Sequence, residues 1–125
     1  MEDLQALQGS WEQTRFEENG LIDPPDMHGG NGAITTIDGD AFAVRLPGGD
    51  LLLAGRFILD PSTTPRSITW IDSMGEDAGK HLPASYVLDG DSFVFIAGDE
   101  GKPRPVEFAT SPGLTLRGFV RCGAV

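Results

Sequence analysis

Short apolar runs separated by turn-forming residues dominate this chain and most limit the folds open to it. Glycine and proline, with 17 and nine residues, interrupt the sequence throughout, and an aspartate–glycine–aspartate step lies at both 38–40 and 89–91. Turn signals recur roughly every ten residues, which suits short strands and leaves little room for helices. The pattern therefore predicts an all-β chain with tight antiparallel connections.

The runs predict eight or nine strands after a short helical turn over Asp3–Gln8. A closed antiparallel up-and-down barrel of about eight strands is favoured over a sandwich, because closure leaves no exposed sheet edge. Residues 1–125 form one domain in this interpretation. The expected strands are Ser10–Glu18, Ala33–Ile37, Ala41–Leu46, Leu51–Leu59, Arg66–Asp72, Ala84–Leu88, Ser92–Ala97, Val106–Ala109 and Leu114–Cys122.

Large apolar side chains alternate along several of these strands. In the strand at 92–97, two phenylalanines share one face while valine and isoleucine occupy the other. Strands that are apolar on both faces need an outer cover, for which we expect the N-terminal turn or a partner. The aromatic residues expected to line the interior, as packed core or as the wall of a cavity, are Phe42, Phe57, Trp70, Tyr86, Phe93 and Phe95.

A glycine–serine–tryptophan step at Gly9–Trp11 opens the first strand directly after the helical turn. The glycine lets the chain bend tightly, and the tryptophan is large enough to plug one end of a small barrel. An arginine stacked on its ring would complete the plug, and the last strand offers Arg117 and Arg121.

These residues resemble the lipocalin and fatty-acid-binding (calycin) superfamily, whose first strand carries a glycine–any–tryptophan motif and whose last strand carries an arginine over that tryptophan. The resemblance implies a calycin barrel in which Gly9, Trp11 and Arg121 have a structural role.

Nearly the whole chain also resembles a family of small lipocalin-like bacterial domains, abundant in planctomycetes. The matching blocks are Leu7–Trp11, Phe57–Thr69, Tyr86–Asp91, Pro103–Phe108 with Ser111–Gly113, and a final strand that ends at Arg121. The chain departs from many members in lacking an export signal and in its long loop at 23–32. This resemblance implies the barrel fold and little assigned chemistry.

The formal net charge of −10 excludes several partners. Binding to nucleic acid or to an anionic membrane needs a basic surface, so neither is expected. A single cysteine, Cys122, cannot form an internal disulfide, and a small buried hydrophobe is the expected role for it. The N-terminus lacks the basic start and apolar run of a signal peptide, which predicts a cytoplasmic protein.

No catalytic, metal or cofactor motif stands out. His28 and His81 lie in separate glycine-rich loops without a second ligand at metal-binding spacing. The aspartate pairs at 38/40 and 89/91 bracket glycines, which hairpin turns already explain. We therefore expect a non-enzymatic protein.

Two functions remain open at this point. The first is an acidic module that inhibits a basic protein, for example an immunity protein that neutralises a bacterial toxin. Its contact surface would be the loops at 23–32 and 73–81, with candidate residues Asp23, Asp26, His28, Glu76 and Asp77. The second is a lipocalin-type carrier of one small apolar ligand inside the barrel.

Overall fold

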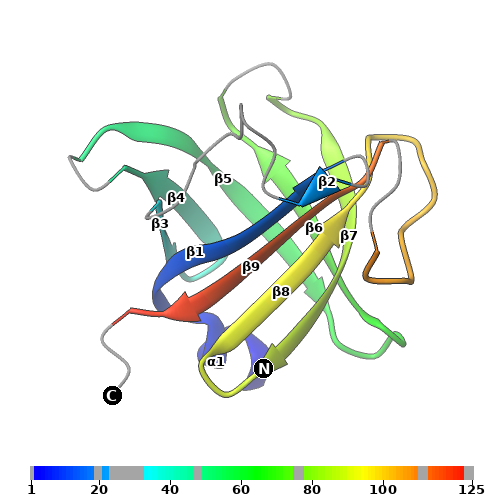
Figure 1. Cartoon of the computed structure of the whole chain (residues 1–125), viewed down its shortest axis with the longest axis horizontal. Helices are drawn as coiled ribbons and strands as arrows, with labels where there is room; N and C mark the ends of the chain where they lie inside the picture. The colour runs from blue at the N-terminus through cyan, green and yellow to red at the C-terminus, as the bar shows by residue number, and fades with distance from the viewer. Residues whose placement is uncertain are drawn as a thin grey trace.

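The computed structural model describes residues 2–18, 21–22, 33–46, 49–74, 78–109 and 113–122. They form a short helix and a closed antiparallel barrel (Figure 1). Strand β2 pairs with the end of β1, and the other eight strands close the barrel. The elements are α1 (Glu2–Leu7), β1 (Gly9–Glu18), β2 (Leu21–Ile22), β3 (Ile34–Asp38), β4 (Ala41–Arg45), β5 (Leu51–Asp60), β6 (Arg66–Asp72), β7 (His81–Asp89), β8 (Ser92–Ala97) and β9 (Thr115–Arg121).

The barrel closes between its first and last strands. From β3 to β9 each strand pairs antiparallel with the next along the chain, and β1 joins β3 on one side and β9 on the other. The β1–β9 ladder runs from Trp11 opposite Arg121 to Glu18 opposite Thr115. The predicted up-and-down barrel of about eight strands, with its N-terminal helical turn, is confirmed.

The segment at 98–109 is not a strand, and the prediction of one at Val106–Ala109 is wrong. It crosses the outside of the barrel, at the right of Figure 1. Pro103 and Pro105 have no N–H to give to a sheet ladder, so this stretch is held by side chains instead. Ser85 donates its hydroxyl to the carbonyl of Pro105 at 2.5 Å.

Arg104 fastens the same segment to the sheet. Its guanidinium donates to the carbonyls of Ile68 and Ala84, at 2.9 and 2.6 Å, and to the hydroxyl of Thr69 at 3.0 Å. We call residues 98–109 the strap. It is tied to both β6 and β7 through one side chain.

The strap covers the apolar outer face of the barrel. Ser85, Ile96 and Leu116 lie side by side across β7, β8 and β9, and all three are buried together with Pro105. This explains why β8 is apolar on both faces: one side meets the interior and the other meets the strap. The cover is therefore a later part of the chain and not the N-terminal turn, which lies at one end of the barrel (Figure 1).

Two further boundaries differ from the predictions. Strand β7 begins at His81 and includes Pro83, where we expected loop and then a strand from Ala84. The short strand β2 was not expected. In the described part of the chain, no helix has the length and apolar character needed to cross a membrane.

Candidate functional site

One end of the barrel is closed by α1 and by Trp11 at the start of β1. Gly9 joins the two elements with a φ of 114°, a left-handed conformation that costs glycine little. Trp11 is 0% exposed, and its indole N–H donates to the carbonyl of Leu7 at 2.9 Å. Gln8 ties this corner to the β3–β4 turn, because its side chain both donates to and accepts from the backbone of Gly39, at 3.0 and 2.6 Å.

Arg121 covers the outer side of this closed end. Its guanidinium carbon lies 4.3 Å from the centre of the Trp11 ring. Its N–H groups donate to the carbonyls of Ala6 and Gln8, the latter at 2.8 Å, and to the carboxylate of Asp91 at 3.0 Å. One side chain thus holds the helix, the first strand and the β7–β8 turn together.

Above the closed end, the barrel interior contains a cavity of about 630 Å³. A cavity of this size suits a small-molecule ligand. Its wall is made mainly of aromatic and aliphatic side chains from the strands. The seven aromatic residues in the wall are Trp11, Phe16, Phe42, Trp70, Phe93, Phe95 and Phe119.

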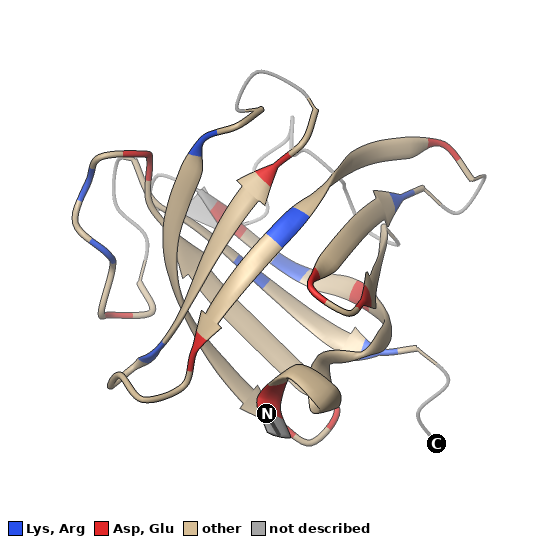
Figure 2. Cartoon of the chain, turned by 180° about the vertical axis from the view of Figure 1, so that it is seen from behind, with Lys and Arg blue, Asp and Glu red and all other residues tan. Residues whose placement is uncertain are grey.

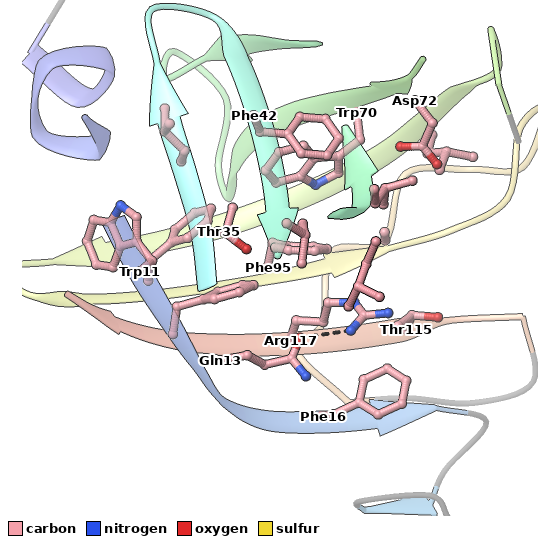
Figure 3. Close-up of a pocket in the computed structure, with 18 of the residues that line it drawn as sticks. Trp11, Gln13, Phe16, Thr35, Phe42, Trp70, Asp72, Phe95, Thr115 and Arg117 are labelled. Carbon is pink, nitrogen blue, oxygen red and sulfur yellow. Dashed lines mark hydrogen bonds between the residues drawn. The ribbon is translucent and has the colours of Figure 1, made fainter. Parts of the chain in front are cut away.

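Trp70 of β6 stands at the centre of this aromatic wall. Its ring centroid lies 5.1 Å from that of Phe42, 5.6 Å from that of Phe57 and 4.9 Å from that of Phe95. Gly55 makes room for this packing: a Cβ at its position would lie 2.8 Å from the Phe42 ring and 2.2 Å from a backbone oxygen. The rings therefore hold one another in a defined arrangement around the cavity (Figure 3).

A polar pair and a further aromatic ring, from β1 and β9, lie in the same cavity. The register of β1 against β9 shifts between Gln13 and Arg15, so Gln13 and Phe16 both face inward although three positions apart. Arg117 of β9 donates to the side-chain oxygen of Gln13 at 2.8 Å, the dashed line in Figure 3. Its guanidinium carbon also lies 4.4 Å from the centre of the Phe16 ring.

Charged groups of both signs line the cavity at the end opposite α1. Asp72 ends β6, Asp99 follows β8, and Arg117 is two residues into β9, and all three are in the wall. At this end Asp99 is exposed and Arg117 is half-buried, whereas Asp72 is buried. The cavity is therefore apolar near Trp11 and polar toward this end, which we call the polar end.

Four of the six aromatic residues predicted for the interior wall line the cavity: Phe42, Trp70, Phe93 and Phe95. Phe57 is buried behind Trp70 and is not part of the wall. Tyr86 is buried beside α1, where its hydroxyl donates to the carboxylate of Asp3 at 2.6 Å.

Burial and the neighbouring Asp3 carboxylate raise the pKa of Tyr86 well above its usual value. Arg66 completes this group: it donates to Asp3 at 2.9 Å, and its guanidinium carbon lies 5.2 Å from the Tyr86 ring centre. Tyr86 therefore anchors the helix to the barrel.

Gln13 and Arg117 were missed as cavity residues. Gln13 alternates with the inward Trp11, so alternation along β1 was a signal for it, whereas Phe16 faces inward only because of the bulge. The structure also decides between the two arginines of the last strand: Arg121 stacks on Trp11, and Arg117 points into the cavity. The sequence did indicate that Arg117 faces inward, because Arg117 and Arg121 are four residues apart and so lie on the same face of one strand.

The residues proposed for a protein partner, Asp23, Asp26, His28, Glu76 and Asp77, lie outside the described residues. The acidic residues that are described stand mostly at strand ends and in turns rather than in one patch (Figure 2). A protein-binding role for the acidic loops therefore stays a prediction.

The described residues contain no cluster of three or more histidine, cysteine or acidic side chains suited to a metal ion. At the 38–40 turn, Asp40 accepts a hydrogen bond from Arg56 at 2.7 Å, and this contact lowers the pKa of the Asp40 carboxyl. At the 89–91 turn, Asp91 accepts from Arg121. Asp40 and Asp91 therefore each have an arginine as a structural partner. His81 is exposed at the start of β7, and Cys122 is half-buried.

Comparison with protein families, with curated proteins and with solved structures found no match to this chain.

Proposed function

We propose that this protein is a non-enzymatic binding protein that holds one small, largely apolar molecule inside its barrel. The observation that carries the proposal is the cavity of about 630 Å³ with its aromatic wall. An eight-stranded barrel can be filled by its own side chains or can leave room for one ligand. In this chain the inward side chains leave room.

The wall supports an amphipathic ligand with a defined orientation. Burying apolar ligand surface against the rings at the Trp11 side contributes roughly 25 cal/mol per Å². A polar group on the ligand is accommodated at the opposite end, where Asp72, Asp99 and Arg117 line the cavity. The ligand therefore enters with its apolar part first.

The resemblance to lipocalin-like domains supports this function by analogy. The alternative, an acidic inhibitor of a basic protein in the cytoplasm, rests on the net charge and on loops outside the described residues. A pull-down from the source cells separates the two. A stoichiometric basic protein, released by salt, would favour the inhibitor, and a co-purifying small molecule would favour the carrier.

The direct test is binding of N-phenyl-1-naphthylamine, a dye whose fluorescence rises in apolar surroundings. We expect saturable binding of one dye per chain. Ala97 is in the cavity wall, so Ala97→Trp should take up part of the space and weaken binding. Ala43 alternates with the inward Phe42 and Val44 on β4, so Ala43→Trp adds the same side chain outside the barrel and should leave binding unchanged. Equal binding by both variants would refute a ligand site in the barrel.

A further inference from the structure

The indole N–H of Trp70 has no hydrogen-bond partner within the described part of the chain. Among the described residues, its Nε1 is the buried side-chain polar atom left without one. Trp70 is 7% exposed and lines the cavity, and Figure 3 shows its ring projecting inward beneath Phe42. Buried indole N–H groups usually find an acceptor, because leaving a buried donor unsatisfied is costly.

The second tryptophan of the chain provides the comparison. Trp11 lines the same cavity, and its N–H donates to the carbonyl of Leu7 at 2.9 Å. Trp11 therefore has a structural role that is complete within the chain. Trp70 has the same indole N–H, and none of the described residues accepts a hydrogen bond from it.

The surroundings of the Trp70 N–H define what can reach it. Phenyl rings of Phe42, Phe57 and Phe95 pack against the indole, and their faces are at best weak acceptors. A ligand atom meets the N–H when one of the cavity rings, Phe42 or Phe95, turns aside, and side-chain rotations of this kind are common on binding. An uncharged oxygen suits these apolar surroundings, since an anion buried among the rings would be far more costly.

We propose that Trp70 selects the ligand: the bound molecule carries an uncharged acceptor oxygen, such as a ketone, ester or ether oxygen, within its apolar body, and this oxygen accepts from the Trp70 N–H. The proposal rests on the proposed function and narrows the ligand class. Under this proposal, Trp70 favours such molecules over plain hydrocarbon chains or rings, which have no acceptor for its N–H.

Fluorenone and fluorene form a matched pair of probes, because they share one ring skeleton and differ in a single ketone oxygen. Their dissociation constants are measured by displacement of N-phenyl-1-naphthylamine from the whole chain. We expect fluorenone to bind roughly three- to tenfold more tightly than fluorene, the range of one net hydrogen bond.

Two variants test whether Trp70 causes the preference for fluorenone over fluorene. Trp70→Phe removes the unpartnered N–H and should make the two probes bind equally. Ala43→Trp adds an indole outside the barrel, leaves the cavity wall intact and should keep the preference for fluorenone. Since either variant can lose stability, the wild-type protein provides an independent readout. With two tryptophans in the chain, a ¹⁵N-labelled sample gives two indole signals, and fluorenone but not fluorene should move the Trp70 proton downfield.

The outcomes are distinguishable. If the dye binds but both probes bind wild type equally, or if the Trp70 signal responds alike to both, the cavity is a ligand site and the role of Trp70 is overturned. If Trp70→Phe keeps the preference for fluorenone, the selecting group is misassigned. If the dye itself does not bind, the proposed function fails and this inference fails with it.

Discussion

The guanidinium carbon of Arg121 lies 4.3 Å from the centre of the Trp11 ring, so the last strand of the barrel is fastened to the first at the closed end. The contact combines a cation–π interaction with hydrogen bonds from the same arginine to the carbonyls of Ala6 and Gln8. Because β1 and β9 are far apart in sequence, this pair joins the two ends of the chain where the barrel closes.

Replacing Trp11 with alanine should lower the free energy of unfolding by roughly 3–5 kcal/mol, as truncation of a large core aromatic does. The ring is fully buried and lies 5.8 Å from that of Phe93, so the change leaves a void at the closed end. Urea denaturation measures the loss. An unchanged midpoint for Trp11→Ala would show that this end does not depend on the plug.

Arg121→Lys keeps the positive charge but removes the planar guanidinium, whose several N–H groups donate at once. This variant should lower the free energy of unfolding by about 1–3 kcal/mol, measured by the same denaturation.

Gly55→Ala should destabilise the barrel and disturb the cavity wall. A Cβ there would lie 2.2 Å from the carbonyl oxygen of Ile71, which is backbone and cannot move aside cheaply. Overpacking of this kind costs about 1–3 kcal/mol or more. The control is Gly98→Ala, since Gly98 is also buried but its added Cβ would meet neighbours no closer than 3.6 Å. Thermal melting compares the two, and equal shifts would contradict the assigned clash.

Tyr86 should resist ionisation in the folded protein. Folding raises its pKa above the ordinary value of 10.0, so the folded chain keeps a proton that the unfolded chain releases. The stability that Tyr86 contributes is complete below about pH 10 and is lost as the pH rises above that value. Tyr86 is the single tyrosine of the chain, so ultraviolet titration reports this group alone. A native titration midpoint near 10 would contradict the buried contact with Asp3.

Tyr86→Phe is the matching variant for alkaline stability. It removes the hydroxyl while Asp3 keeps its contact with Arg66. Between pH 10 and the onset of unfolding, the variant should lose less stability than wild type, because it has no phenol to ionise. Parallel stability curves for the two proteins would show that another group causes the alkaline loss.

Arg104→Ala should loosen the strap without opening the barrel. The guanidinium makes three hydrogen bonds to β6 and β7, and losing bonds from a charged group costs about 1.5–3 kcal/mol. Hydrogen exchange should become faster along 98–109 while the β1–β9 ladder stays protected. Lys102→Ala changes an exposed side chain of the same strap and serves as the control. Equal protection of the strap in both variants would rule out Arg104 as its anchor.

The sequence by itself determined the barrel, its strand order and its closed end. Hairpin turns at 38–40 and 89–91 and the alternation along the strands are local signals, and each requires only neighbouring residues to be read. The sequence also predicted the plug at Gly9–Trp11 and limited the arginine that stacks on it to Arg117 or Arg121. The turns, the alternation and the Gly9–Trp11 step follow from chain geometry over a few residues, whereas closure of the barrel was favoured because it leaves no exposed sheet edge.

Only the tertiary structure decided the strap and the contents of the interior. The run at Val106–Ala109 looks like a strand because an apolar stretch does not show whether it pairs within a sheet or crosses over one. The bulge after Gln13 reverses the facing of Phe16, so one extra residue is enough to bring its ring into the cavity beside Arg117. Whether the barrel is hollow depends on whether the inward side chains of all the strands together fill its interior. No single segment of the sequence determines that sum.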